Sequence, residues 1–166
     1  MPDENVPKIA PTVFVLPLQV VEADIDLMGH VNNIVYLRWV QEVATAHWNV
    51  AATEQQKAEY AWVVLRHEID YKRPALLGEA LEARTYVGEA SGAKFERHVE
   101  IWRVEDNQLL ARARSVWAAL DAHTLRPRRV EAGLREQFQN DIGAEPTDMG
   151  RNTIASDRTG AYQVDL

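Results

Sequence analysis

The sequence contains no cysteine. This absence excludes a disulfide framework, thiolate metal ligands and a cysteine nucleophile, and it fits a reducing compartment. Long apolar runs are also missing, since no stretch approaches the about 20 apolar residues that cross a bilayer. The N-terminal segment is polar and lacks the basic and apolar regions of a secretion signal. We therefore expect a cytoplasmic protein with no membrane partner.

Positive charge is scarce. The chain has 18 Lys and Arg residues against 25 Asp and Glu residues, which gives a net charge of -7. This balance argues against general nucleic-acid binding, because such binding needs a basic surface to neutralise phosphates. The histidines at positions 47, 98 and 123 show no metal-ligand spacing, so we expect no metal and no resident cofactor.

The length of 166 residues, with 46% hydrophobic and 26% charged residues, suits a single globular domain. We expect this domain to span residues 12–140. It follows a polar lead-in at 1–11 and precedes a tail at 141–166 that has little apolar periodicity.

The order of apolar and polar residues predicts one long helix and several long strands. Residues 32–48 contain no Gly or Pro and are apolar around most of a helical circumference, which predicts a helix that is buried on nearly all sides. Residues 12–22 predict a strand that Pro17 places at an edge or a bulge. Alternating runs at 61–72, 79–89, 94–105 and 108–121 predict further antiparallel strands. Short helices are expected at 52–59 and 131–139. The pattern favours an α+β fold in which a curved sheet of about five strands grips one helix.

The segment before the long helix concentrates polar residues with chemical potential. One interpretation is a strand-to-helix turn with capping residues, which is the common role of Asp and Asn at such places. The other is a reaction site, because the first N–H groups of a helix lack internal partners and lie at the positive end of its dipole. Such N–H groups can hold an oxyanion while a carboxylate acts on the carbon. The residues concerned are Asp24, Asp26, His30, Val31, Asn32 and Asn33.

Two motifs in this chain resemble those of hotdog-fold acyl thioesterases, the superfamily of 4-hydroxybenzoyl-CoA thioesterase. The first is Asp26-x-x-x-His30-Val31-Asn32-Asn33 followed by Tyr36-Leu37. The second, YKRPALLGE at 71–79, is similar to the link between the second and third strands of that family, and a weaker match follows the last strand at 121–127. The resemblance covers roughly residues 12–140 and implies the hotdog fold.

The resemblance also implies a reaction, namely hydrolysis of an acyl-CoA or acyl-carrier-protein thioester to an acid and a thiol. Asp26 matches the catalytic carboxylate, as nucleophile or general base, and His30 matches a histidine of this branch. The stretch from Val31 to Asn33 matches the backbone that polarises the carbonyl. Met28 stands where plant-type enzymes have Asn, so an Asp-plus-helix mechanism is favoured over an Asp/Asn/His one. A thiolate leaving group, with a conjugate acid near ~8.5, needs little general-acid help.

Further residues are candidates for substrate contact. His67 lies on the apolar face of its run and is expected to line a core or pocket rather than act as a base, and Glu42 is expected to form an ion pair. The Arg residues at 126–129 either form a solvated basic loop or, with Lys72 and Arg73, bind the phosphates of coenzyme A, since arginine binds phosphate well. The predicted substrate-binding residues are Tyr36, His67, Lys72, Arg73, Arg126, Arg128 and Arg129.

The resemblance implies a homodimer with the acyl site at the subunit interface, sometimes paired into a homotetramer, and coenzyme A would enter only as part of the substrate. Two other functions remain open. A hotdog hydratase or dehydratase is disfavoured because Asp26 and His30 lie too close along one turn. A non-catalytic protein that binds acyl-CoA or another small ligand is disfavoured by the intact Asp26.

Overall fold

The computed structural model describes residues 12–140, so the expected lead-in and tail lie outside the described residues. Apart from the short 3-10 helix η1, which the sequence does not predict, the elements follow the predicted order, with boundaries that differ by a few residues. They are β1 (Phe14–Gln19), η1 (Glu22–Asp24), α1 (Asn33–Ala51), α2 (Glu54–Glu59), β2 (Tyr60–Tyr71), β3 (Ala80–Ser91), β4 (Lys94–Arg103), β5 (Gln108–Asp121) and α3 (Ala132–Asn140).

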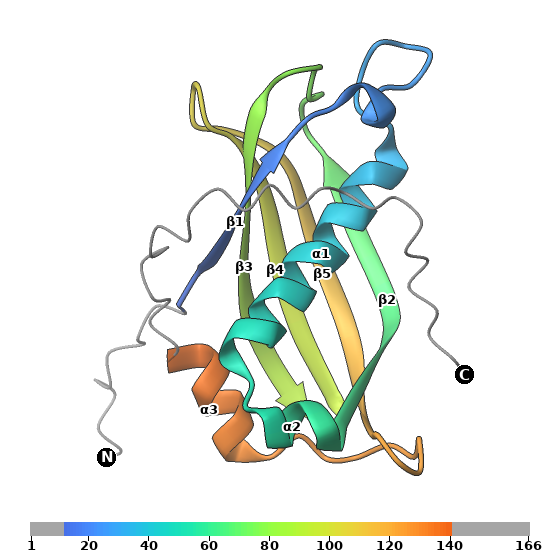
Figure 1. Cartoon of the computed structure of the whole chain (residues 1–166), viewed down its shortest axis with the longest axis vertical. Helices are drawn as coiled ribbons and strands as arrows, with labels where there is room; N and C mark the ends of the chain where they lie inside the picture. The colour runs from blue at the N-terminus through green and yellow to red at the C-terminus, as the bar shows by residue number, and fades with distance from the viewer. Residues whose placement is uncertain (1–11, 141–166) are drawn as a thin grey trace, which may run out of the picture.

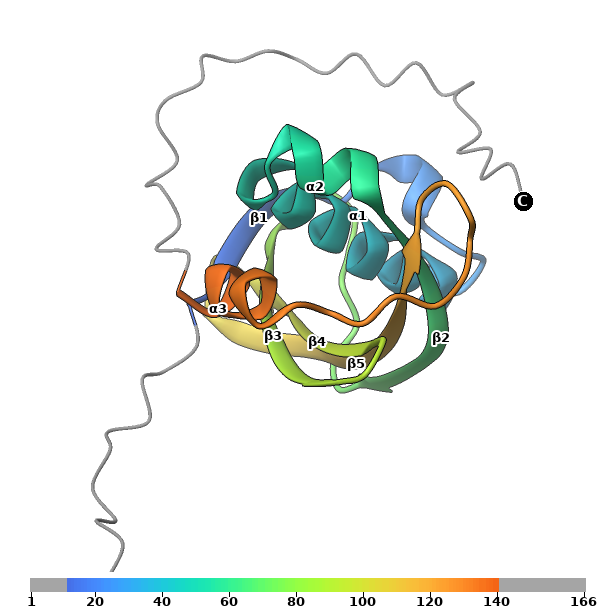
Figure 2. The ribbon, with the colours of Figure 1, turned by 90° about the horizontal axis from the view of Figure 1, so that it is seen from below.

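The strands form one antiparallel sheet in the order β1-β3-β4-β5-β2. The sheet curves around α1, which lies along its concave face, while α2 and α3 lie at one end of the molecule (Figures 1 and 2). This arrangement confirms the α+β hotdog fold. Pro17 lies in β1, one of the two edge strands, as its missing N–H requires.

The burial of β3 and β4 alternates residue by residue, as the period-two pattern predicts. The pattern predicted for β2 is wrong in one respect. The register of β2 shifts between Val64 and Arg66, so Leu65 is left at a bulge and is 54% exposed. One extra residue reverses the alternation. Trp62 before the bulge and Ile69 after it therefore both pack on the inner side, against two core clusters.

Helix α1 packs one broad side into the sheet through buried residues such as Trp39, Val40 and Val43. Its other side is open in the single chain, where Ile34 is 68% exposed and Val50 is 65% exposed. The prediction of burial on nearly all sides is therefore wrong for one chain. Within the described residues, no helix combines the length and hydropathy needed to cross a membrane.

Candidate active site

The polar segment before α1 forms a closed loop at one end of the molecule, at the upper right in Figure 1. Ile25 and Val31 form an isolated antiparallel bridge, and the N–H of Asp26 donates to the carbonyl of His30 at 2.8 Å. Gly29 has a φ of +79°, a conformation that residues with a side chain rarely adopt. The loop therefore holds the backbone of Asp26 in place directly before the helix.

The carboxylate of Asp26 is half-buried and is oriented by the loop itself. Its Oδ1 accepts hydrogen bonds from the N–H of Met28 at 2.8 Å and of His30 at 3.4 Å. Among residues 12–140, no side chain forms an ion pair with Asp26, and its Oδ2 accepts no hydrogen bond. The loop thus fixes one oxygen and leaves the other available to a substrate or a water molecule.

Asp24, two residues earlier, has a different environment. Its side chain is only 2% exposed, forms an ion pair with Arg38 at 2.7 Å, and accepts from the N–H of Val21 at 3.1 Å. A buried carboxylate with both oxygens engaged supports the fold rather than reacts. Of the two aspartates, Asp26 is the one suited to chemistry.

The start of α1 has fewer available N–H groups than the sequence suggests. The N–H of Val31 donates to the carbonyl of Ala75 at 3.0 Å, and that of Asn32 donates to the carbonyl of Asp24 at 2.8 Å. Asn32 is the N-cap, and its side chain accepts from the N–H of Ile34 at 3.1 Å. Among the N–H groups from Val31 to Asn33, only that of Asn33 has no acceptor within the described residues. The predicted oxyanion donor therefore narrows to Asn33.

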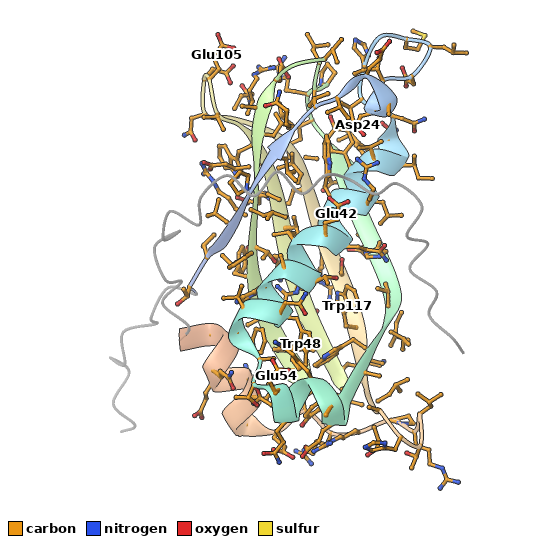
Figure 3. The ribbon with its side chains drawn as sticks, in the orientation of Figure 1. Asp24, Glu42, Trp48, Glu54, Glu105 and Trp117 are labelled. Atoms are coloured by element: carbon orange, nitrogen blue, oxygen red, sulfur yellow. The ribbon has the colours of Figure 1, made fainter. Side chains whose placement is uncertain are left out.

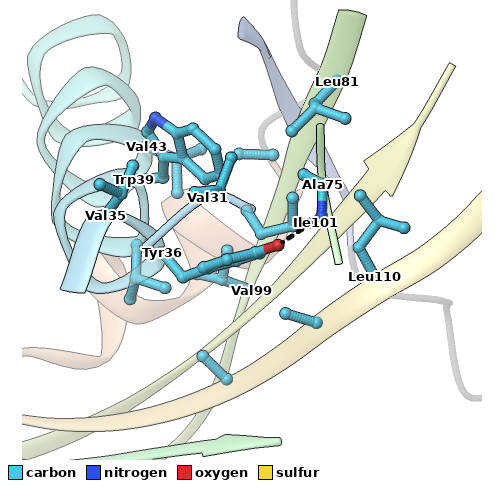
Figure 4. Close-up of a cluster of buried hydrophobic side chains, with 14 of the residues drawn as sticks. Val31, Val35, Tyr36, Trp39, Val43, Ala75, Leu81, Val99, Ile101 and Leu110 are labelled. Carbon is cyan, nitrogen blue, oxygen red and sulfur yellow. Dashed lines mark hydrogen bonds between the residues drawn. The ribbon is translucent and has the colours of Figure 1, made fainter. Parts of the chain in front are cut away.

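The second motif lies against the first. The Tyr71 hydroxyl donates to the carbonyl of Asn33 at 3.1 Å, and the N–H of Ala75 donates to the Tyr36 hydroxyl at 3.0 Å (Figure 4). Tyr36 is 2% exposed, and burial raises its pKa, so it stays a neutral phenol. This position favours a supporting role for Tyr36 over the substrate contact that the sequence analysis expects.

Two histidines of the predicted site lie in different surroundings. His30 is exposed on the loop. The Nδ1 atom of His67 lies 2.7 Å from the Ser115 hydroxyl, and its Nε2 atom is buried without a partner among the described residues. Burial lowers the pKa of His67, so the ring is neutral at pH 7. His67 therefore lines the inside of the sheet, as expected.

The predicted basic substrate-binding residues form two separate basic spots within one chain: Lys72 with Arg73, and Arg126 with Arg128 and Arg129. Lys72 and Arg73 follow β2 at the end that carries the Asp26 loop, whereas the 126–129 segment lies at the opposite end, near α2 (Figure 1). Arg128 forms ion pairs with Glu59 and Glu131 and is engaged there. One isolated chain therefore cannot form a single phosphate-binding site from both basic spots.

Glu42 forms the expected ion pair, with its Oε1 3.3 Å from Nε of Arg38. Burial raises the pKa of Glu42 in spite of that neighbouring charge. Within residues 12–140, no group of three His, Asp or Glu side chains is arranged to hold a metal ion.

The Asp26 loop is flanked by exposed apolar side chains. Leu27 is 106% exposed and Met28 is 78% exposed, and Ile34, in the first turn of α1, is 68% exposed. Asp26 lines neither the cavity between α1, the sheet and α3 nor the one between α3 and the β3–β4 turn. In the described chain the Asp26 loop is therefore open to solvent, and the apolar side chains beside it are uncovered.

Sequence reasoning missed one polar cluster inside the sheet. Arg97 donates through Nη1 to Nδ1 of His47 at 3.0 Å and to the Thr85 hydroxyl at 3.1 Å. The alternation of β4 contains the signal, because Arg97 has the same parity as the buried residues Phe95 and Val99.

The curved sheet around one helix, with an aspartate loop at the helix start, defines a hotdog protein with a candidate acyl-transfer site. The family model of the thioesterase-like superfamily matches residues 20–138, so the chain belongs to that superfamily and to the class of thioester hydrolases.

Two curated relatives share parts of the chain. The long-chain acyl-CoA thioesterase FadM of Escherichia coli is 28% identical over 120 residues, which cover 69% of this chain and 89% of FadM. The chloroplastic acyl-[acyl-carrier-protein] hydrolase FATB3 of Cuphea viscosissima is 29% identical over 85 residues. That match covers 51% of this chain and 21% of the plant protein.

Solved structures share the fold. The probable thioesterase YbaW of Escherichia coli superposes with a TM-score of 0.69 at 24% identity and covers 78% of this chain and 98% of YbaW. The 1,4-dihydroxy-2-naphthoyl-CoA thioesterase Slr0204 of Synechocystis gives a TM-score of 0.68 at 22% identity, with 80% and 99% covered.

Proposed function

We propose that this chain hydrolyses an acyl thioester to a free acid and a thiol at the Asp26 loop, with coenzyme A as the carrier. One observation carries the proposal. Among the described residues, Oδ2 of Asp26 accepts no hydrogen bond and the N–H of Asn33, the first residue of α1, has no acceptor. The substrate carbonyl accepts from the N–H of Asn33, and Asp26 attacks the carbon or deprotonates a water molecule that does so. The thiolate then leaves as the tetrahedral intermediate collapses. When Asp26 is the nucleophile, a water molecule next hydrolyses the acyl–Asp26 anhydride, which releases the free acid and restores the carboxylate.

A preorganised donor supports such a reaction because charge develops on the carbonyl oxygen in the transition state. Removal of one donor of this kind typically costs roughly 10²–10³ in rate. The hydrogen bond from Tyr71 to the Asn33 carbonyl and the contact of Val31 with Ala75 hold the helix start in position. Bond formation at the carbon is thus assigned to Asp26 and stabilisation of the oxyanion to the backbone.

A second copy of the chain would complete the site, and edge strand β2 is suited to bind it. β2 has 12 residues and no proline, in contrast to β1 with six residues and Pro17. A long unpaired edge favours pairing with another strand. Two-fold antiparallel pairing of β2 with itself brings the Tyr60 end of one copy beside the Tyr71 end of the other.

Such a homodimer would unite the two basic spots that lie apart in one chain. The exposed Arg126 and Arg129 of one copy would approach Lys72 and Arg73 of the other, next to an Asp26 loop. Guanidinium and ammonium groups bind phosphate, so this arrangement favours coenzyme A over a carrier protein. A homotetramer and a cytoplasmic location stay predictions.

The test is hydrolysis of a panel of acyl-CoAs, followed by detection of the released thiol. The variant Asp26→Asn keeps an oxygen that accepts from Met28 but removes the charge. It should lower kcat/KM by roughly 10²–10⁴, the range for a positioned acid or base. Glu105→Gln is the matched control, because Glu105 is an exposed carboxylate at the same end of the molecule (Figure 3), and its activity should equal that of the wild type.

Three results would contradict the proposal. Turnover of the Asp26→Asn variant at the wild-type rate would remove Asp26 from the mechanism. Conversion of an enoyl thioester without release of thiol would indicate a hydratase. Binding of acyl-CoAs without any turnover would indicate a non-catalytic binding protein.

A further inference from the structure

A cavity of about 180 Å³ lies between the C-terminal half of α1, the inner side of the sheet and α3. Its walls are mostly aromatic, and the labelled side chains of Trp48 and Trp117 lie in this region between α1 and the sheet (Figure 3). Trp48 stacks on Phe138 with ring centroids 5.5 Å apart and meets Trp62 edge-on at 5.6 Å. Thr45, an exposed residue of α1, lies on its rim.

This aromatic cavity contains one buried cationic side chain. Arg97 lines the cavity and is only 8% exposed. Within residues 12–140 it forms no ion pair, and its only hydrogen-bonding nitrogen is Nη1, which contacts His47 and Thr85. The one acidic residue of the lining, Glu96, is paired with Arg114.

The charge of Arg97 is not balanced by its neighbours. Burial lowers the pKa of Arg97 to about 10, so the guanidinium keeps its proton at pH 7. Burial and the Arg97 charge lower the pKa of His47 to about 3, so that ring is neutral. Two further donors of the lining, Nε1 of Trp62 and Nε1 of Trp117, are buried without partners among the described residues. A buried charge is costly unless it is paired, so this wall has donors in excess and lacks an anion.

We propose that this cavity binds a small aromatic monocarboxylate, with its ring against the tryptophans and its carboxylate on the guanidinium of Arg97. An apolar cavity of about 150 Å³ can hold a benzene ring, whereas pockets for drug-sized ligands begin at about 300 Å³. The volume therefore fits one ring with a short polar group. Guanidinium and carboxylate form paired, charge-assisted hydrogen bonds, which accounts for the choice of anion.

The site is separate from the Asp26 loop. Ala44, the first residue of α1 in the cavity lining, follows Asn33 by eleven residues, a rise of about 16 Å along the helix. One benzoate molecule in the cavity therefore does not reach the N–H of Asn33. Binding of benzoate in this cavity does not require the proposed hydrolysis at Asp26.

Benzoate is the probe, with benzamide as its neutral counterpart, and both are titrated into the full chain at pH 7. Quenching of tryptophan fluorescence reports occupancy because three tryptophans line the cavity. Benzoate should bind roughly 10- to 100-fold more tightly than benzamide, the range for a hydrogen bond to a charged group. Arg97→Met should abolish this preference.

A pair of variants on the exposed side of α1 covers the case in which Arg97→Met does not fold. Thr45→Phe places a ring at the rim and should block benzoate. Asn49→Phe, one turn further along and outside the lining, should leave binding unchanged. Equal affinity for benzoate and benzamide, no binding of benzoate, or unchanged binding in Thr45→Phe would each overturn the proposal.

Discussion

The two ends of helix α1 place a charged group in opposite surroundings. At the start, Asp26 is half-buried, and the hydrogen bonds to its carboxylate come from the N–H groups of its own loop. Toward the other end, Arg97 is held inside aromatic walls by His47 and Thr85, which come from α1 and β3. The first end is built by local turn chemistry and the second by packing. Reactivity is therefore expected at the first end, and a large share of the stability at the second.

The largest expected effect on the free energy of unfolding follows from packing at the second, C-terminal end of α1. Phe138 is 1% exposed and lies with its ring centroid 4.9 Å from that of His47. Phe138→Ala should lower the free energy of unfolding by about 3–5 kcal/mol, since it removes a buried ring and leaves a cavity. Leu27→Ala, at the exposed first end, should change it by less than about 0.5 kcal/mol. Urea unfolding of both variants measures the difference.

The opposite results in the Phe138 and Leu27 variants would contradict the assignment of stability to the C-terminal end of α1. A large loss of stability in Leu27→Ala would show that Leu27 is buried in an assembly and is not exposed as it is in the single chain. A small loss in Phe138→Ala would show that α3 contributes little to the packing around Trp48.

The fold was predictable because its signals are periodic and local. The alternation over 108–121 gives the bounds of β5, and Pro17 marks an edge strand. The bulge at Leu65 was not predictable, since it depends on how β2 pairs with β5 and not on the composition of β2. The exposed side of α1 was also missed, because an apolar helix does not reveal whether one chain or two cover it.

The candidate site was predictable only in part. Asp26 and the helix start are adjacent in the sequence, so a motif can identify them. The N–H groups of Val31 and Asn32 are engaged by carbonyls of Ala75 and Asp24, and a contact such as that with Ala75 requires the fold. The Arg97 and His47 contact joins residues 50 positions apart, so no local pattern could predict it.

An intermediate effect is expected when the pH is lowered, and it concerns His47 at the second end. The pKa of His47 is about 3 in the folded chain and 6.5 as its ordinary value, so the unfolded chain binds a proton first. Its contribution to stability is complete above pH 6.5 and decreases as the pH falls toward 3, by about 1.4 kcal/mol for each unit.

The contribution of His47 can be isolated by comparison with His47→Gln, whose amide oxygen can still accept from Arg97. The unfolding free energies of both proteins are measured from pH 7 to pH 4. The wild type should lose more unfolding free energy per pH unit than His47→Gln. Parallel slopes would show that protonation of His47 is not penalised in the folded chain.

The smallest expected effect concerns Asn32, which caps α1 at the first end. Asn32→Asp retains the cap, since Asp and Asn are equally good N-caps, and the added charge favours the helix dipole. Its unfolding free energy should therefore equal or slightly exceed that of the wild type. Its kcat/KM should fall roughly ten-fold, because the added negative charge repels the oxyanion that forms at the Asn33 N–H. A ten-fold loss corresponds to about 1.4 kcal/mol of such repulsion in the transition state.

Asn32→Ala should show the reverse combination, with a loss of about 1 kcal/mol in stability and a nearly unchanged rate. Together the two variants separate the cap from the electrostatics of the helix start. If rate and stability change in parallel in both, Asn32 acts only as a cap and the reacting carbonyl does not lie at the first turn of α1. If Asn32→Asp alone loses activity at full stability, negative charge develops beside the Asn33 N–H during the reaction.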